Sequence, residues 1–261
     1  MRQRQRKKAD PLWDYRPFYV ELFSGSEVWS DGMRRRGCKV YSFDILQGPE
    51  GDLLRPSVMR RVLKLVRSGH CLGVLAGVPC TTFSIARGGH NAIRSKDFPA
   101  GLPGLSARLQ AQIDDGNKLF FNAIRVFDQC IKYHVPFLWE NPQSSYMWKM
   151  PDAVRISSLP HVEDVITHYC GWGTAWKKPT RFRTFLVPDA DRLHKKCCGR
   201  GGYCSFTGEA HHVLQGRDAS GVHWTRRANP YPPSLVKALC SAFQDAGFAQ
   251  QFPLSVKASS F

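Results

Sequence analysis

A cysteine stands directly after a proline in the segment GVPCTTFSIAR, which follows the apolar run CLGVLA. The rigid Pro79 leaves the Cys80 thiol little freedom, as suits a nucleophile that must meet a substrate atom accurately. Burial as a small hydrophobic side chain is the alternative role of such a cysteine. A second reactive group is Glu140, in LWENP, which can protonate or hydrogen-bond a heterocycle, unless it serves a turn or a helix cap. Together the two residues predict nucleophilic and acid chemistry at one site.

Six short apolar runs are expected to form the strands that position these groups. Several of the runs lack polar alternation, as do parallel strands that are covered on both faces. Residues 114–134 repeat apolar side chains at three- and four-residue spacing, which predicts a helix with one buried face. This order predicts an α/β protein with a doubly wound, mostly parallel sheet that binds ligands outside the carboxyl ends of its strands. The predicted strands are residues 18–23, 39–45, 71–77, 136–141, 165–169 and 182–187.

Gly25 and Asp44 end the first two strand regions, so they fall on the same sheet edge as Cys80 and Glu140. A glycine between a strand and a helix lets a cofactor approach the backbone, and an acidic residue after the second strand suits a pair of ribose hydroxyls. The segment ELFSGSEVW lacks the complete dinucleotide fingerprint. We therefore expect a nucleoside cofactor without a pyrophosphate rather than NAD.

The chain is strongly basic, with a formal net charge of +16. Such an excess repels itself within a compact protein, so it predicts a polyanionic partner, for which nucleic acid is the leading choice and solubility the plain alternative. Nine cysteines, an odd number, and the absence of an apolar leader predict an intracellular protein of a reducing compartment, nuclear in a eukaryote. No apolar stretch is long enough to predict a membrane span.

Seven segments, taken in order, resemble the motifs of the cytosine-5 DNA methyltransferase family, as in a divergent and compact member. The match they define extends over about residues 18–243 apart from the segment 188–222, and their shared order is far more specific than any one motif. The segments are VELFSGSEVW, FDI, GDLL, GVPCTTFS, LWENP, KKPTRFRTFLV and ANPYPPSLVKAL.

The resemblance implies a Rossmann-like methyltransferase fold and transfer of a methyl group from S-adenosylmethionine to carbon 5 of cytosine. By resemblance, the Cys80 thiolate adds to carbon 6 of a flipped-out cytosine, while Glu140 binds and protonates ring nitrogen 3. Arg183 is expected to contact the base or stabilise the adduct, with Arg181 supporting it electrostatically. The residues expected to hold the cofactor are Phe23, Gly25, Asp44, Asp52, Pro79 and Asn229.

The chain departs from the family pattern at four places, although no reacting group is lost. Ser26 replaces a usual glycine, Val78 a usual proline or glycine, Pro142 a usual valine and Pro179 a usual glutamine. Two alternatives therefore stay open, a nucleic-acid-binding protein that has lost turnover and an RNA cytosine-5 methyltransferase. Double-stranded DNA is the expected partner, RNA the alternative, and a partner protein could supply target recognition.

Basic residues flank the predicted site on both sides. Several lie in the segment 86–108, which is rich in Gly and Pro and long for a simple connection, so we expect a functional loop beside the cysteine. The basic residues on both sides of the site are expected to neutralise phosphates beside an extruded base. The residues assigned to nucleic-acid binding are Ser84, Arg87, Arg94, Lys96, Lys177, Lys178, Arg226 and Arg227.

Residues 188–222 lack helix or strand periodicity and concentrate cysteine and histidine. Structural zinc needs four such ligands, so we expect a small insertion held by a zinc ion, with loop histidines and surface thiols as the alternative. The expected ligands are His194, Cys197, Cys204 and His211. The expected divisions are a basic tail (1–16), a catalytic domain (17–187), the insertion as a reduced target-recognition region (188–222), a return to the catalytic domain (223–250) and a tail (251–261).

Overall fold

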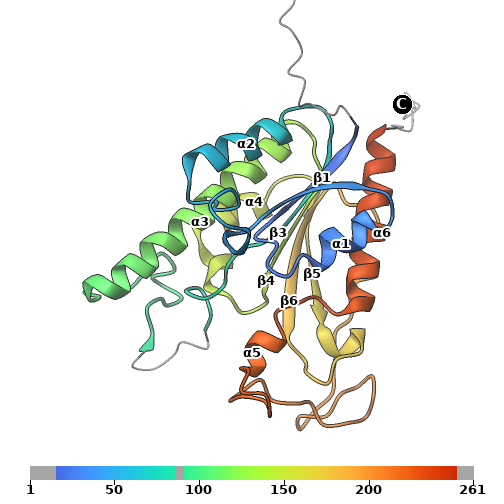
Figure 1. Ribbon diagram of the computed structural model, residues 1–261. Coiled ribbons are helices and arrows are strands. Elements are labelled where there is room, and N and C mark those ends of the chain that lie inside the picture. Colours follow the sequence, from blue (N-terminus) through green and yellow to red (C-terminus); the bar gives the residue numbers. More distant parts are fainter. Residues whose placement is uncertain (1–15, 86–90, 252–261) are drawn as a thin grey trace, which may run out of the picture.

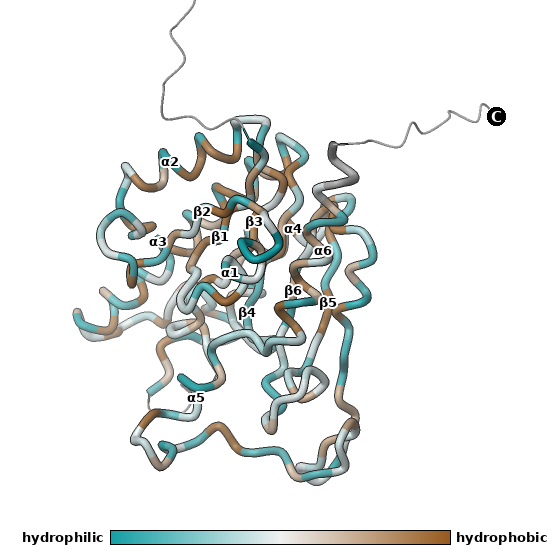
Figure 2. The backbone as a smooth tube through the Cα atoms, turned by 45° about the vertical axis from the view of Figure 1, so that its right-hand side comes forward, coloured by the Kyte–Doolittle hydropathy of each residue, from teal (hydrophilic) through white to brown (hydrophobic). Residues whose placement is uncertain are grey.

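A computed structural model describes residues 16–85 and 91–251 of the chain. One six-stranded sheet runs through its centre, with helices on both sides, as Figures 1 and 2 show from two directions. Each of the six predicted strands is present within a few residues of its expected position. The strands are β1 (Phe18–Leu22), β2 (Lys39–Phe43), β3 (Cys71–Gly77), β4 (Phe137–Pro142), β5 (Val162–His168) and β6 (Pro179–Phe185).

The sheet is mixed and mostly parallel, in the order β2-β1-β3-β4-β6-β5. Neighbours among the first four strands pair in parallel, whereas β6 runs antiparallel to both β4 and β5. All five residues of β1 are buried, as expected of a central strand that is covered on both faces. The α/β class is thus confirmed.

Each face of the sheet carries its own apolar core. One core joins the sheet to α2 (Pro56–Val66), α3 (Ala107–Lys132) and α4 (Pro151–Ser157). The other joins it to α1 (Val28–Arg34) and α6 (Pro233–Gln251), which contact each other. A Cβ on Gly32 of α1 would lie 2.9 Å from Val236 Cγ1, so a glycine is required where these two helices meet.

The long helix α3 begins seven residues before the predicted start at residue 114. Its first buried side chain is Ile113, and the turns before it lie mostly in solvent. An exposed first turn shows no apolar period, so the periodicity marked only the part of the helix that packs on the sheet.

Short turns of helix link the larger elements at the ends of the strands. The segment 188–222 contains one such turn, at Ala190–Leu193, and isolated β-bridges, but no α-helix or strand. These turns are η1 (Ile45–Gln47), η3 (Tyr146–Lys149), η4 (Tyr169–Trp172), η5 (Ala190–Leu193) and the short helix α5 (Trp224–Arg227).

Among the residues that the structure describes, no helix is both long and apolar enough to span a bilayer. The basic tail predicted for residues 1–16 lies outside the described residues except at Arg16, and so does the tail 251–261 except at Gln251.

Candidate active site

A cavity of about 490 Å³ opens at the carboxyl ends of β1 and β3, and β4 forms part of its wall. We call it the strand-end cavity. Eight residues predicted to be functional line it, namely Phe23, Gly25, Pro79, Cys80, Glu140, Lys178, Arg226 and Asn229. The cavity therefore brings together residues from the ends of three strands and from the segment before α6, as expected from the rule that ligands of such sheets bind at strand ends.

Neighbouring strands hold Cys80 in place. The amide of Asn141 in β4 donates a 2.6 Å hydrogen bond to the carbonyl of Val78, two residues before the cysteine. The N–H of Phe83 donates to the carbonyl of Cys80 at 2.9 Å, and Phe83 itself is fully buried. The thiol is half-buried at the cavity wall, on a backbone fixed at both ends.

Glu140 lines the same cavity, and one of its carboxylate oxygens has no partner among the described residues. Its Oε1 is buried and accepts no hydrogen bond from any part of the chain that the structure describes. Burial raises the pKa of Glu140, and the positive charge of Lys178 opposes this. The pKa of Cys80 is also raised, first by burial and then by Glu140, and Lys178 again acts in the opposite direction. The cavity thus holds a carboxyl group of raised pKa together with a thiol.

Two of the predicted cofactor residues, Phe23 and Gly25, line the cavity just after the end of β1. Gly25 has a φ of +50° and open space where a side chain would project, so a ligand can approach its backbone. Asp44 does not line the cavity. Its Oδ2 accepts a 2.9 Å hydrogen bond from the N–H of Gly25, so it shapes the turn that does. Asp52 lies further back and accepts a hydrogen bond from the N–H of Leu54.

Glu21 also lines the cavity and was missed from the sequence. It is 3% exposed and accepts hydrogen bonds from the N–H and hydroxyl of Ser30 in α1. Burial raises its pKa to about 7. The signal was available, because an acidic residue inside the apolar run FYVELF must have a buried partner.

The expected roles of Arg181 and Arg183 at the reacting base are wrong for this structure. Neither residue lines the strand-end cavity. Both guanidinium groups bind Asp164 of β5, at 3.0 Å and 2.8 Å. Arg183 is paired across the sheet with Trp139, and paired residues share a face, so it points into the core opposite the face of Glu140.

Lys178 takes the place in the cavity that the two arginines were expected to occupy. It lies just before β6 and is half-buried, among the residues that line the cavity with Cys80 and Glu140. Its Nζ donates a 2.8 Å hydrogen bond to the carbonyl of Ala228. It was predicted to bind a phosphate at the surface, and its position beside the thiol and the carboxyl group replaces that assignment.

Arg94 was also assigned to phosphate binding, and the structure contradicts this. It is 2% exposed, and its guanidinium donates to the carbonyls of Thr82 and Pro99 and to the side chain of Asn117. Its charge stacks 3.7 Å from the centre of the Phe83 ring. Arg94 therefore anchors the loop after Cys80 onto α3.

Of the remaining described residues assigned to nucleic-acid binding, only Arg226 lines the cavity. Arg226 is exposed and lines the cavity, whereas Arg227 is exposed but pairs with Asp218 at 2.6 Å. Lys96 is exposed, Lys177 and Ser84 are half-buried, and Arg87 lies outside the described residues.

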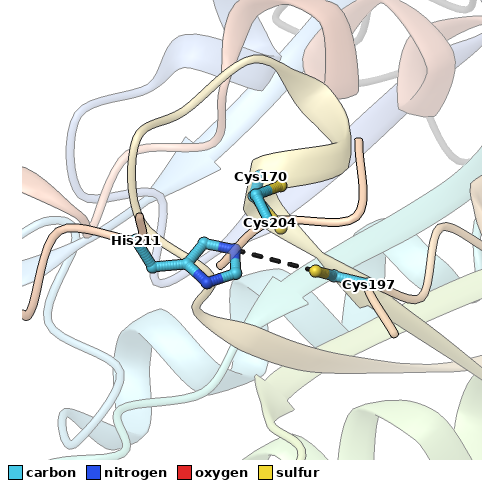
Figure 3. A group of neighbouring side chains, drawn as sticks. All are labelled: Cys170, Cys197, Cys204 and His211. Carbon is cyan, nitrogen blue, oxygen red and sulfur yellow. Dashed lines mark hydrogen bonds between the residues drawn. The ribbon is translucent and has the colours of Figure 1, made fainter. Parts of the chain in front are cut away.

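Three cysteines and a histidine meet beside the end of β5, as Figure 3 shows. The ligand atoms of Cys170, Cys197, Cys204 and His211 all lie within 4.8 Å of one another, a group that could hold a metal ion. Cys170, from η4, takes the place predicted for His194. His194 is exposed and follows η5, so it was the wrong fourth member.

Neighbouring groups hold this cluster together. The N–H and hydroxyl of Ser205 donate to Cys197 Sγ at 3.3 and 3.5 Å. The N–H of Cys197 donates to His168 Nδ1 of β5 at 3.0 Å. The cluster therefore joins the segment 188–222 to the edge of the sheet.

No protein-family model matches this chain, and no curated protein matches it in sequence.

Proposed function

We propose that this protein transfers a methyl group from S-adenosylmethionine to carbon 5 of cytosine in DNA. One observation carries the proposal. Cys80 and Glu140, which are 60 positions apart in the chain, line one cavity at the strand ends, and Glu140 presents a buried oxygen without a partner. A buried polar atom without a partner is costly, so such an oxygen suits a ligand that supplies a hydrogen bond.

The chemistry proposed for the two residues is the one that the resemblance to cytosine-5 methyltransferases implies, and their setting supports it. The Cys80 thiolate adds to carbon 6 of cytosine, and a sulfur–carbon bond forms as the electron pair of the 5,6 double bond moves toward carbon 5. Glu140 donates a proton to ring nitrogen 3 as this occurs, which its raised pKa favours. After carbon 5 has gained its methyl group, it loses its proton to water, the sulfur–carbon bond breaks, ring nitrogen 3 returns its proton to Glu140 and the thiolate is restored.

S-adenosylmethionine would supply the electrophilic methyl group, and the β1 end of the cavity fits such a ligand. Gly25 leaves open space above its backbone, and Asp44 fixes that turn from behind. The cavity volume lies within the range of about 300–1,000 Å³ that is usual for small-molecule sites. Phe23, Gly25, Pro79 and Asn229 would hold the nucleoside and its methionine portion, with Asp44 supporting the turn.

DNA is proposed as the substrate on the basis of charge and of position. The net charge of +16 favours a polyanionic partner, and the exposed Arg226 lines the cavity itself. The segment 188–222 is short and has little regular structure, so extensive base reading by this segment is not part of the proposal.

The test is transfer of labelled methyl from S-adenosylmethionine to duplex DNA, single-stranded DNA and RNA. We expect label in duplex DNA with the wild type, none with Cys80→Ser, and wild-type label with Cys198→Ser, because Cys198 is exposed and outside the cavity. Label in RNA alone would move the assignment to RNA methylation. Cofactor binding without label in any nucleic acid would favour the binding protein without turnover.

We also propose that Cys170, Cys197, Cys204 and His211 bind a structural zinc ion. Zinc prefers four tetrahedral sulfur and nitrogen ligands, and bond lengths of about 2.3 and 2.0 Å place such ligands roughly 3.6 Å apart. Cys197 Sγ and His211 Nε2 are 3.7 Å apart. The N–H and O–H donors around Cys197 are the kind of support that metal-bound thiolates receive. The ion would fasten a segment that has almost no apolar core of its own.

Metal analysis of the purified protein tests this assignment. We expect one zinc per chain in the wild type, and loss of zinc in Cys170→Ser. His194→Asn and Cys198→Ser should keep it, and they are matched controls because both residues lie beside the cluster without joining it. Zinc retained by Cys170→Ser but lost from His194→Asn would overturn the ligand set read from the structure.

A further inference from the structure

Lys178 lines the strand-end cavity, but the proposed chemistry gives it no role. Its ammonium group is fixed rather than solvated, since Nζ donates to the carbonyl of Ala228 at 2.8 Å and lies 3.4 Å from the hydroxyl of Tyr169. The same Nζ lies 4.5 Å from the centre of the Tyr169 ring, in a cation–π contact. Two segments far apart in the chain, η4 and the residue that follows α5, therefore hold this charge in place.

The backbone at Lys178 is unusual as well. Its φ is +25°, a region that residues with a side chain rarely adopt. Phe23, on the opposite side of the same cavity, has a φ of +57°. Backbone strain of this kind persists only where the surrounding structure enforces it, and it collects at functional sites.

The cation has no carboxylate partner of its own. Among residues 16–85 and 91–251, no acidic side chain lies within ion-pair distance of Lys178. Its charge is directed at the cavity it shares with Cys80 and Glu140. The titratable and charged groups around the thiol come from several elements, and they are Glu21, Glu140, Tyr169, Lys178, Arg226 and Tyr231.

We propose that Lys178 is the group that stabilises the Cys80 thiolate. The thiol proton leaves to water, and the positive charge of Lys178 offsets the burial that disfavours the anion. Burial lowers the pKa of Lys178 as well, and the negative charges of Glu140 and Cys80 oppose this. The effect of Lys178 on the pKa of Cys80, opposite to those of burial and of Glu140, has the direction that this role requires. Lys178 is thus a positioning and activating residue that acts through Cys80. The catalytic role of Lys178 rests on the proposed function, but the effect of Lys178 on the ionisation of the Cys80 thiol does not.

The test is the pH dependence of Cys80 alkylation by iodoacetamide, followed by peptide mass spectrometry so that Cys80 is distinguished from the other cysteines. Lys178→Met should raise the midpoint by at least about one pH unit, which slows alkylation about tenfold at any pH below both midpoints. Lys178→Arg should keep the wild-type midpoint, because it keeps the charge. Lys177→Met removes a neighbouring charge outside the cavity and should also keep it.

Lys178→Gln separates charge from packing if the methionine variant fails to fold, since glutamine keeps a hydrogen-bond donor for Ala228 but carries no charge. The proposal requires a raised midpoint in this variant too. An unchanged midpoint in a folded Lys178→Met or Lys178→Gln variant would overturn it. Methyl transfer does not enter this readout, so failure of the proposed function and failure of this inference give different results.

Discussion

Arg94 offers the clearest case in which the structure and a charge-based interpretation predict opposite results. In the structure its guanidinium donates to the Thr82 carbonyl at 3.1 Å, the Pro99 carbonyl at 2.6 Å and the Asn117 side chain at 2.8 Å. Burial lowers the pKa of Arg94 only to about 10, so it stays charged at neutral pH. Arg94→Met keeps most of the apolar stem and removes every one of these donors.

The expected loss of stability can be worked from these contacts. Each acceptor left without a partner costs about 1 kcal/mol or more, so three of them give roughly 3 kcal/mol, and loss of the contact with Phe83 adds to this. That is a large share of the 5–15 kcal/mol that is typical of a whole domain. Arg94→Lys keeps the charge without the planar fork and should lose less, about 1–2 kcal/mol.

Urea unfolding measures this change, with Lys96→Met as the control. Lys96 is exposed two residues away, so its loss should change the free energy of unfolding by less than about 0.5 kcal/mol. The salt dependence of DNA binding should not change in Arg94→Met. Unchanged stability in Arg94→Met together with a DNA-binding salt slope reduced by about one would refute the structural role and restore the phosphate contact.

Three further predictions concern the cavity and the sheet. Gly77→Ala places a Cβ 3.3 Å from the Tyr231 hydroxyl and 3.7 Å from Glu140 Oε2, so methyl transfer should fall roughly tenfold or more with stability nearly unchanged; undiminished transfer would contradict this. Because burial raises the pKa of Glu21 from 4.5 to about 7, the unfolded state ionises first and stability falls as pH rises between those values. The free energy of unfolding of Glu21→Gln should therefore rise relative to that of the wild type by up to about 3 kcal/mol as the pH increases from 4.5 to 7, as urea unfolding can measure. A difference between the two proteins that does not change with pH would contradict this. Arg183→Met should lose about 2–3 kcal/mol by the same method, since it leaves Asp164 with Arg181 alone and the buried Ala153 carbonyl without its donor, and a variant of full stability would return Arg183 to a role outside the core.

The sequence was a good guide to the sheet and to its reactive edge. Long apolar runs in an α/β order leave few arrangements, and ligand-binding residues of such sheets follow the strands. Cys80, Glu140 and Gly25 were therefore predictable as neighbours although they come from different strands.

Side-chain direction was beyond what the sequence could supply. Arg181 and Arg183 alternate in β6, so they share one face, but nothing in RFR says which face meets the cavity. Lys178 stands just outside the strand on a left-handed backbone, a conformation that local sequence does not signal in a lysine.

Long-range contacts explain the other two misses. Cys170 lies 27 positions before Cys197, on a different element, so a search confined to the cysteine-rich segment chose His194 in its place. A buried arginine such as Arg94 looks like a surface charge in sequence, because arginine is rarely buried and its carbonyl partners carry no sequence signal.

The central claim is that Cys80 is a nucleophile toward cytosine, and a covalent trap tests it most directly. A duplex containing 5-fluorocytosine blocks the loss of the group at carbon 5, so the enzyme should remain attached to the DNA after methyl transfer. With S-adenosylmethionine present, we expect a covalent complex whose mass includes the methylated duplex and whose attachment maps to Cys80, with none formed by Cys80→Ser. Absence of a complex from a folded wild type that binds both the cofactor and the duplex, or attachment at another cysteine, would contradict the account.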